Sequence, residues 1–152
     1  MTMSRDDDDP AHEADALGRI RADRAAALAR EGRLVLVDIR EPAEWAQTGV
    51  PAGAVLAPLT EGPQRLRPDF VADLERAVGG HRDRPVALVC RSGGRTAFAR
   101  RLLLAEGFSR VLDVAEGMAG SNFGPGWLAR GLPVEPWPSA DREGSAVTVT
   151  SP

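Results

Sequence analysis

The one cysteine of the chain lies in a short segment that also holds two arginines and two glycines. The segment reads Cys90-Arg91-Ser92-Gly93-Gly94-Arg95. Gly93 and Gly94 allow backbone torsions that other residues avoid, so successive N–H groups can curl into a nest around an anion. Arg91 and Arg95 add fixed positive charge close to the sulfur. Together these features favour the thiolate of Cys90 over the thiol, and the thiolate is the nucleophilic form.

Cys90 and Ser92 each allow two interpretations. A free cysteine is often a small buried hydrophobe at the end of a strand, but such a residue has no need of two glycines and two arginines beside it. We therefore favour a chemical role for Cys90. Ser92 can either hydrogen-bond a bound sulfur or cap the helix that follows, and the sequence favours neither.

The elements on both sides place Cys90 between a strand and a helix. Pro85 introduces the apolar run 86–89, and apolar residues at helical spacing follow Thr96 until Gly107 ends the pattern. A cysteine directly after a buried parallel strand emerges at the carboxyl edge of the sheet, where α/β proteins place their sites. The N-terminus of the next helix adds its dipole at the same point.

The rest of the chain alternates between strand and helix patterns. Apolar runs predict further strands at 34–37, 54–57 and 111–114, and a short strand near Ile20. Helical patterns are found at 24–30, from Pro42 through Trp45, at 70–78 and around 127–130. This alternation predicts a single α/β domain with a mainly parallel sheet and helices on both of its faces.

Composition limits the partners and the compartment. Nineteen Lys and Arg against 22 Asp and Glu leave a net charge of −3, which indicates neither nucleic acid nor a membrane as partner. One cysteine cannot form an internal disulfide, and His12 and His81 lack the spacing of a zinc site, so we expect no metal. The N-terminus lacks the basic and apolar stretches of a signal peptide. We therefore expect a cytoplasmic protein with a small soluble substrate.

The two ends of the chain differ from its middle. Residues 1–16 include the run Asp6-Asp7-Asp8-Asp9, which repels itself, and they are predicted to form a disordered acidic tail. Residues 136–152 are rich in Pro, Ser and Thr and are predicted to form a mobile tail. The folded domain is expected at residues 17–135.

Several motifs, in the same order along the chain, resemble the rhodanese domain, a sulfurtransferase family in which a loop cysteine carries sulfane sulfur as a persulfide. These are residues 34–42, Glu44-Trp45, Gly53-Ala54, 90–96, Gly107-Phe108, Glu116-Gly117-Met118 and 131–134. About three quarters of the chain takes part, which makes chance agreement implausible. Two departures stand out: the family histidine before the second core strand is missing, and Ala119–Gly126 is longer than the usual turn. This longer segment is expected to shape acceptor choice or to act as a lid.

The resemblance implies a rhodanese-like fold and a role for each site residue. Cys90 would carry the sulfur, and the N–H groups from Arg91 to Thr96, including those of Ser92, Gly93, Gly94 and Arg95, would cradle it. Arg95, together with Arg91, would meet the anionic donor. Asp38 and Arg40 match the family's Asp-x-Arg turn, for which we favour structural support of the site.

The expected activity is that of a thiosulfate-type sulfurtransferase. Thiosulfate or a persulfide would load Cys90, and cyanide, a small thiol or a thioredoxin-like protein would accept the sulfur, with no cofactor. A cysteine phosphatase or arsenate-reductase-like enzyme is disfavoured, because four residues separate Cys90 from Arg95 whereas those enzymes have five. A non-catalytic docking or regulatory module is a second alternative, and a redox sensor is a third, although the latter would need an external thiol.

Overall fold

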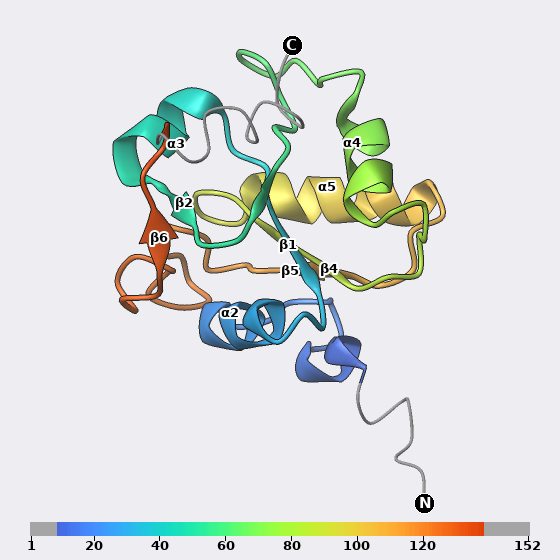
Figure 1. Cartoon of the computed structure of the whole chain (residues 1–152), viewed down its shortest axis with the longest axis horizontal. Helices are drawn as coiled ribbons and strands as arrows, with labels where there is room; N and C mark the ends of the chain where they lie inside the picture. The colour runs from blue at the N-terminus through green and yellow to red at the C-terminus, as the bar shows by residue number, and fades with distance from the viewer. Residues whose placement is uncertain (1–8, 139–152) are drawn as a thin grey trace, which may run out of the picture.

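The computed structural model describes residues 9–138, and these form an α/β fold around a parallel sheet (Figure 1). The sheet has the strand order β3-β1-β4-β5. Its strands are β1 (Val35–Asp38), β3 (Val55–Leu56), β4 (Val86–Val89) and β5 (Val111–Asp113). All pairings are parallel, with Leu36 opposite Ala87 and Leu88 opposite Asp113. The predicted fold class is therefore confirmed, and each predicted core strand is present to within a residue or so at its ends.

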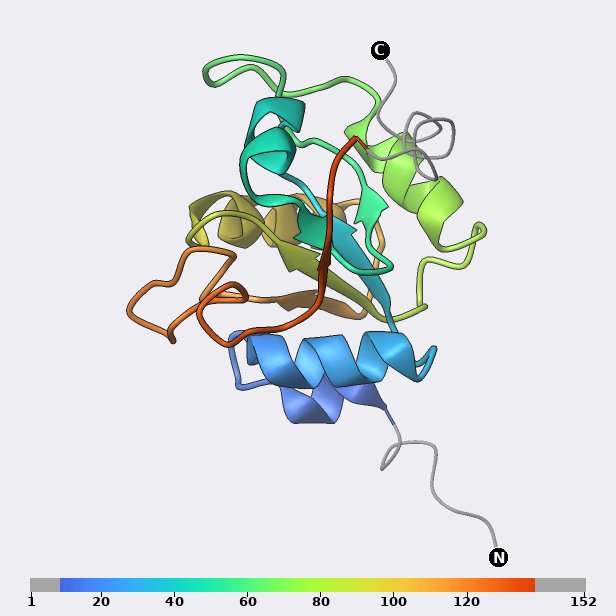
Figure 2. The ribbon, with the colours of Figure 1, turned by 60° about the vertical axis from the view of Figure 1, so that its left-hand side comes forward.

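Helices cover both faces of the sheet. These are α2 (Ala22–Arg30), α3 (Pro42–Thr48), α4 (Phe70–Ala77) and α5 (Gly94–Ala105). Figures 1 and 2 show α2 on one side of the strands and α4 on the other. One apolar core packs α2 and Trp45 of α3 against Leu36 and Ala87, and a second packs α4 and α5 against Val37 and Leu88. Burial on both faces explains why the strands read as continuous apolar runs.

Both ends of the described chain pack onto this core, which corrects the predicted tails. Pro10–Glu13 form a 3₁₀ helix, η1, whose N-cap Asp9 accepts hydrogen bonds from the Ala11 amide and from Arg110 Nε at 3.0 and 2.7 Å. At the other end, the Trp137 ring meets Trp45 edge to face at 5.2 Å. Residues 9–16 and 136–138 are thus ordered parts of the fold. Residues 1–8 and 139–152 of the predicted tails lie outside the described residues.

Three further details differ from the sequence-based expectations. The helix predicted around 127–130 is a pair of hydrogen-bonded turns, in which the Arg130 amide bonds Gly126 O and the Gly131 amide bonds Leu128 O. An unpredicted antiparallel pair joins β2 (Val50–Pro51) to β6 (Val134–Glu135). The strand expected near Ile20 is reduced to a single bridge between Arg19 and Asp113. Within residues 9–138 no helix is long and apolar enough to cross a membrane.

Candidate active site

Cys90 lies where β4 meets the loop before α5, at the carboxyl edge of the parallel sheet. Its side chain is buried, with 1% of the residue exposed. The Gly93 N–H donates to Cys90 Sγ at 3.2 Å. Gly93 is the N-cap of α5 and has the left-handed torsion φ of 100°, which glycine adopts without strain. The sulfur therefore faces a backbone donor and the positive end of a helix of 12 residues.

Two polar side chains of the loop are placed differently. Thr96 is buried, and its hydroxyl donates to Gly93 O at 3.1 Å while lying 3.7 Å from Cys90 Sγ. Thr96 thus fixes the turn and lies in the wall around the sulfur. Ser92 is exposed. Because the N-cap of α5 is Gly93 and has no side-chain cap, Ser92 does not cap the helix.

The Cys90 loop is locked against the turn that follows β5. The Met118 amide donates to Cys90 O at 2.8 Å, and the Ala119 amide donates to Arg91 O at 2.9 Å. This approach is close enough to require glycine: a Cβ on Gly93 would overlap Ala115 O, and one on Gly117 would overlap Arg91 O. These backbone contacts therefore set the shape of the loop together with the Thr96 side chain.

Glu116 anchors that turn, a role that the sequence did not reveal. Its carboxylate is buried and accepts hydrogen bonds from the amides of Ala22 and Gly126, both at 2.8 Å, and from Arg130 Nε at 2.7 Å. Burial on its own raises the pKa of Glu116, but the hydrogen bonds from Arg130 and the two amides outweigh it and lower that pKa. One ionised side chain thus joins the start of α2, the turn behind the loop and the 127–130 segment.

Arg95 is paired with a glutamate rather than pointing freely toward a donor. Its two terminal nitrogens donate to the two oxygens of Glu44 at 2.7 and 2.8 Å. Glu44 also accepts from the Glu41 amide at 3.1 Å, as part of the capping box at the start of α3. The hydrogen bonds that Arg95 donates to Glu44 raise the pKa of Arg95 against the effect of burial, and the charges of Glu44, Cys90 and Asp38 raise it further. Arg95 therefore holds a permanent positive charge beside the loop.

The Glu44–Arg95 pair makes a pH-dependent contribution to stability. Burial raises the pKa of Glu44, but the hydrogen bonds from Arg95 and the Glu41 amide outweigh it, so the folded pKa lies below the reference value of 4.5. The contribution is therefore present above about pH 4.5 and is lost as the pH falls through the folded pKa. We expect Glu44→Gln to lower the free energy of unfolding by about 0.5–1 kcal/mol at pH 7 and by less at pH 3.

Urea unfolding at both pH values checks this expectation. Glu61→Gln is the matched control, because its ion pair with Arg65 is exposed to solvent and 3.6 Å long. A Glu44→Gln effect of equal size at pH 7 and pH 3 would show that the charge of Glu44 is not what stabilises the fold.

Asp38 and Arg40 form a buried ion pair at the end of β1. Asp38 is 0% and Arg40 1% exposed, and Arg40 Nη2 lies 2.8 Å from Asp38 Oδ2. The Arg40 guanidinium also donates to Thr48 Oγ1 and Gly49 O, both at 3.0 Å. The pair thus ties the end of β1 to the end of α3. Between them, the Ile39 amide donates to Val89 O at 3.0 Å, directly beside Cys90.

Arg91 is the exposed arginine of the loop. Within residues 9–138 its side chain makes no hydrogen bond or ion pair, so its guanidinium is available to an anion. A hollow of about 520 Å³ lies on the Arg95 side of the loop, lined in part by Glu44, Thr60 and Gln64. A second hollow of about 480 Å³ adjoins the loop at Ser92, Gly93 and Gly94. The loop can therefore be approached from two sides.

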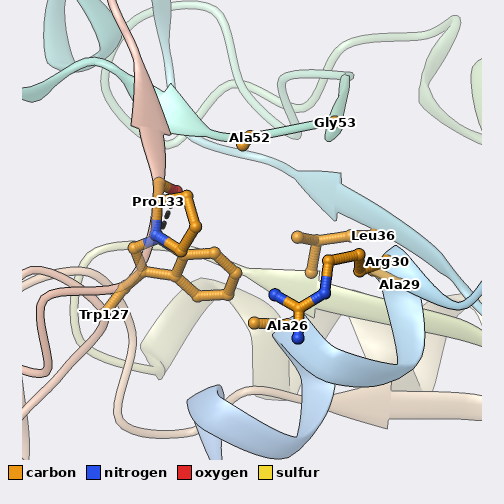
Figure 3. A pocket seen from close by; sticks show the side chains of 8 residues that line it. All are labelled: Ala26, Ala29, Arg30, Leu36, Ala52, Gly53, Trp127 and Pro133. Carbon is orange, nitrogen blue, oxygen red and sulfur yellow. Dashed lines mark hydrogen bonds between the residues drawn. The ribbon is translucent and has the colours of Figure 1, made fainter.

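An apolar hollow of about 260 Å³ lies away from the loop, between α2 and the 127–133 segment (Figure 3). One wall is Trp127, whose Nε1 donates to Pro133 O at 3.0 Å, and the Arg30 side chain lies across from it. No residue of the Cys90 loop lines this hollow, so it lies apart from the candidate site.

Comparison with known proteins relates this geometry to a family. The rhodanese-like domain model matches residues 21–121. A sulfurtransferase from Allochromatium vinosum is 34% identical over 101 residues, which cover 66% of this chain and 78% of that protein. The crystal structure of Rv0390 from M. tuberculosis matches with a TM-score of 0.64 at 30% identity, over 78% of this chain and 96% of that one. A polysulfide-sulfur transferase homodimer from Wolinella succinogenes shares the fold, with a TM-score of 0.59 at 22% identity over 86% of this chain and 85% of that one.

Proposed function

The chain belongs to the rhodanese-like domain family, as its sequence motifs predicted, and we propose that it is a sulfurtransferase that carries sulfane sulfur on Cys90. The observation that carries the proposal is the Gly93 N–H donated to Cys90 Sγ at the N-terminus of α5. A backbone donor and a helix dipole stabilise negative charge on this sulfur, both as the attacking thiolate and as the thiolate that leaves when an acceptor takes the outer sulfur.

In the first half-reaction, the Cys90 thiolate attacks the outer sulfur of a donor, for which we propose thiosulfate. A new S–S bond forms on Cys90, the S–S bond of the donor breaks, and sulfite leaves with the electron pair. The exposed Arg91 and the loop amides would bind the donor anion. Arg95, held by Glu44, would supply charge beside the sulfur and keep the loop in place. A persulfide or polysulfide could load Cys90 by the same displacement.

In the second half-reaction, a nucleophile takes the outer sulfur and Cys90 leaves as the thiolate. Cyanide would serve in an assay, and a small thiol or a thioredoxin-like protein in the cell. Neither step calls for a metal or an organic cofactor. We place this chemistry in the cytoplasm, where reducing conditions would keep Cys90 free to react.

The loop also bears on the alternatives. Four residues separate Cys90 from Arg95, which gives a tighter cradle than a phosphoryl group needs, so we set a cysteine phosphatase or arsenate reductase below a sulfurtransferase. A docking module would not need the buried sulfur, its amide donor and the paired Arg95 together. A redox sensor would need a second thiol from outside the chain.

Steady-state kinetics test the proposal. A persulfide intermediate requires sulfite to leave before the acceptor reacts, so double-reciprocal plots of rate against thiosulfate at several cyanide concentrations should give parallel lines. Hydrolysis of p-nitrophenyl phosphate, measured alongside, should stay at background. Intersecting lines would contradict the two-step mechanism, and phosphate release dependent on Cys90 would favour the phosphatase alternative.

A further inference from the structure

The hollow of about 480 Å³ beside the loop, which we call the α5 pocket, is built from several parts of the chain. Ser92, Gly93 and Gly94 form its end at the Cys90 loop. The face of α5 that continues from Gly94 through Ala97 to Arg101 forms one wall, since these residues recur every three or four positions. Leu17 and Phe123 contribute from the N-terminal segment and from the long segment 119–126.

The charge of the α5 pocket is positive where solvent reaches it. Arg19, Arg100 and Arg101 line it. Arg19 is paired with Asp15 at 2.7 Å, whereas Arg101 is exposed and makes no hydrogen bond or ion pair within the described part of the chain. Arg100 donates through Nε to Val111 O at 2.7 Å, which holds its guanidinium in place. The one acid in the lining, Asp113, is 5% exposed, and burial raises its pKa despite the opposing effects of Thr96, Arg100 and Arg19. An anion therefore meets the arginines rather than the carboxyl group.

The α5 pocket also has an apolar rim that is already in position. Leu17 is 61% and Phe123 55% exposed, although both are large apolar side chains. The Arg19 guanidinium lies over the Phe123 ring, with Arg19 Cζ 4.3 Å from the ring centroid. Ser121 Oγ donates to Ala115 O at 2.9 Å and accepts the Phe123 amide at 3.1 Å. The segment 119–126 is thus tied to the turn behind the loop, which makes it a wall of the α5 pocket rather than a free lid.

We propose that the α5 pocket binds the sulfur acceptor, and that this acceptor is a low-molecular-weight thiol bearing a carboxylate. Its carboxylate would pair with Arg101 and Arg100, and its aliphatic part would contact Leu17 and Phe123. Thiosulfate and cyanide are too small to use both ends of the site. A volume of this order suits a molecule the size of a short peptide, and the thiol would then lie at the Ser92–Gly94 end.

This inference rests on the proposed function, because the acceptor reacts with the Cys90 persulfide. The acceptor thiolate attacks the outer sulfur and forms a new S–S bond. The bond between that sulfur and Cys90 Sγ breaks, and the electron pair leaves on Cys90 as thiolate. No oxidant or reductant is consumed, and the acceptor leaves as its persulfide. The outer sulfur extends the reactive atom about 2 Å beyond Cys90 Sγ.

The test compares two thiols on protein that already carries the persulfide, with loading verified by intact mass. Glutathione, which has carboxylates, should discharge the persulfide of Arg101→Glu about tenfold more slowly than that of the native protein. The neutral thiol 2-mercaptoethanol should discharge both at the same rate. Arg84→Glu is the matched control, with the same charge change on an exposed residue at the opposite edge of the sheet, before β4. It should leave both rates unchanged.

Binding is measured separately from reaction. S-methylglutathione cannot react with Cys90, and the saturable shifts that it causes in the Phe123 and Arg100 NMR signals should be present in the native protein and weakened in Arg101→Glu. If the native protein binds S-methylglutathione as expected but does not load sulfur, the proposed function is wrong and the assignment of the pocket stands. Normal loading, with glutathione rates insensitive to Arg101→Glu or with no saturable shifts, would overturn the acceptor site.

Discussion

Cys90→Ser is expected to abolish sulfur transfer while leaving the fold intact. Serine cannot hold a sulfane sulfur, so kcat/KM for thiosulfate and cyanide should fall on the order of 10³-fold or more. The site is buried, but a serine hydroxyl would find partners in the Gly93 N–H and the Thr96 hydroxyl. The free energy of unfolding should therefore change by no more than about 1–2 kcal/mol. Steady-state rates and urea unfolding of the same preparation measure the two effects.

Cys90→Ala is the companion variant. It removes the same sulfur and cannot form these hydrogen bonds, so it should be equally inactive and somewhat less stable. Retention of more than about 1% of kcat/KM by the serine variant would show that the sulfur of Cys90 is not the carrier.

Arg40→Met is expected to be the most destabilising of the substitutions considered for this site. Methionine keeps much of the volume of the side chain but leaves the Asp38 carboxylate buried without its charged partner, which costs about 3–5 kcal/mol. The hydrogen bonds from Arg40 to Thr48 and Gly49 are lost as well. Because these contacts tie β1 to α3 beside Cys90, sulfur transfer should decline through loss of folded protein and not through a specific effect on KM.

Two further variants isolate the cause. Arg24→Met makes the same exchange at an exposed pair with Glu13, 3.1 Å long, and should lower the free energy of unfolding far less than Arg40→Met does. Asp38→Asn combined with Arg40→Met removes the buried charge and should recover part of the loss. Urea unfolding at pH 7 gives all four free energies. If Arg24→Met and Arg40→Met lower the free energy of unfolding equally, the buried pair stabilises the fold no more than the exposed pair does.

The sequence predicted the elements whose signals are local. The run 86–89 and the helix after Thr96 follow from apolar spacing and from Pro85 and Gly107, and together they placed Cys90 at the sheet edge. The family resemblance was likewise visible, since its motifs are short and continuous in the chain. The position of Gly93 also had a local signal, because a glycine pair after a strand indicates an unusual torsion.

The contacts that the sequence did not reveal join residues far apart in the chain. Glu44 and Arg95 are 51 positions apart, and Glu116 is 94 positions from Ala22, so neither pairing leaves a periodic or motif signal. The strands β2 and β6 have two residues each, too few for alternation to show. In the 127–130 segment, helical spacing was misleading, because hydrogen bonds from Gly126 and Trp127 to Glu116 and Gly117 fix it as a turn.

The most direct test of the central claim is the intact mass of the reduced protein before and after incubation with thiosulfate, and again after cyanide. The proposed mechanism predicts a gain equal to about one sulfur atom, absent from Cys90→Ser and reversed by cyanide. If the native protein gains no mass from thiosulfate or from a polysulfide, or if Cys90→Ser gains the same mass, Cys90 does not carry sulfur and the proposed function is wrong.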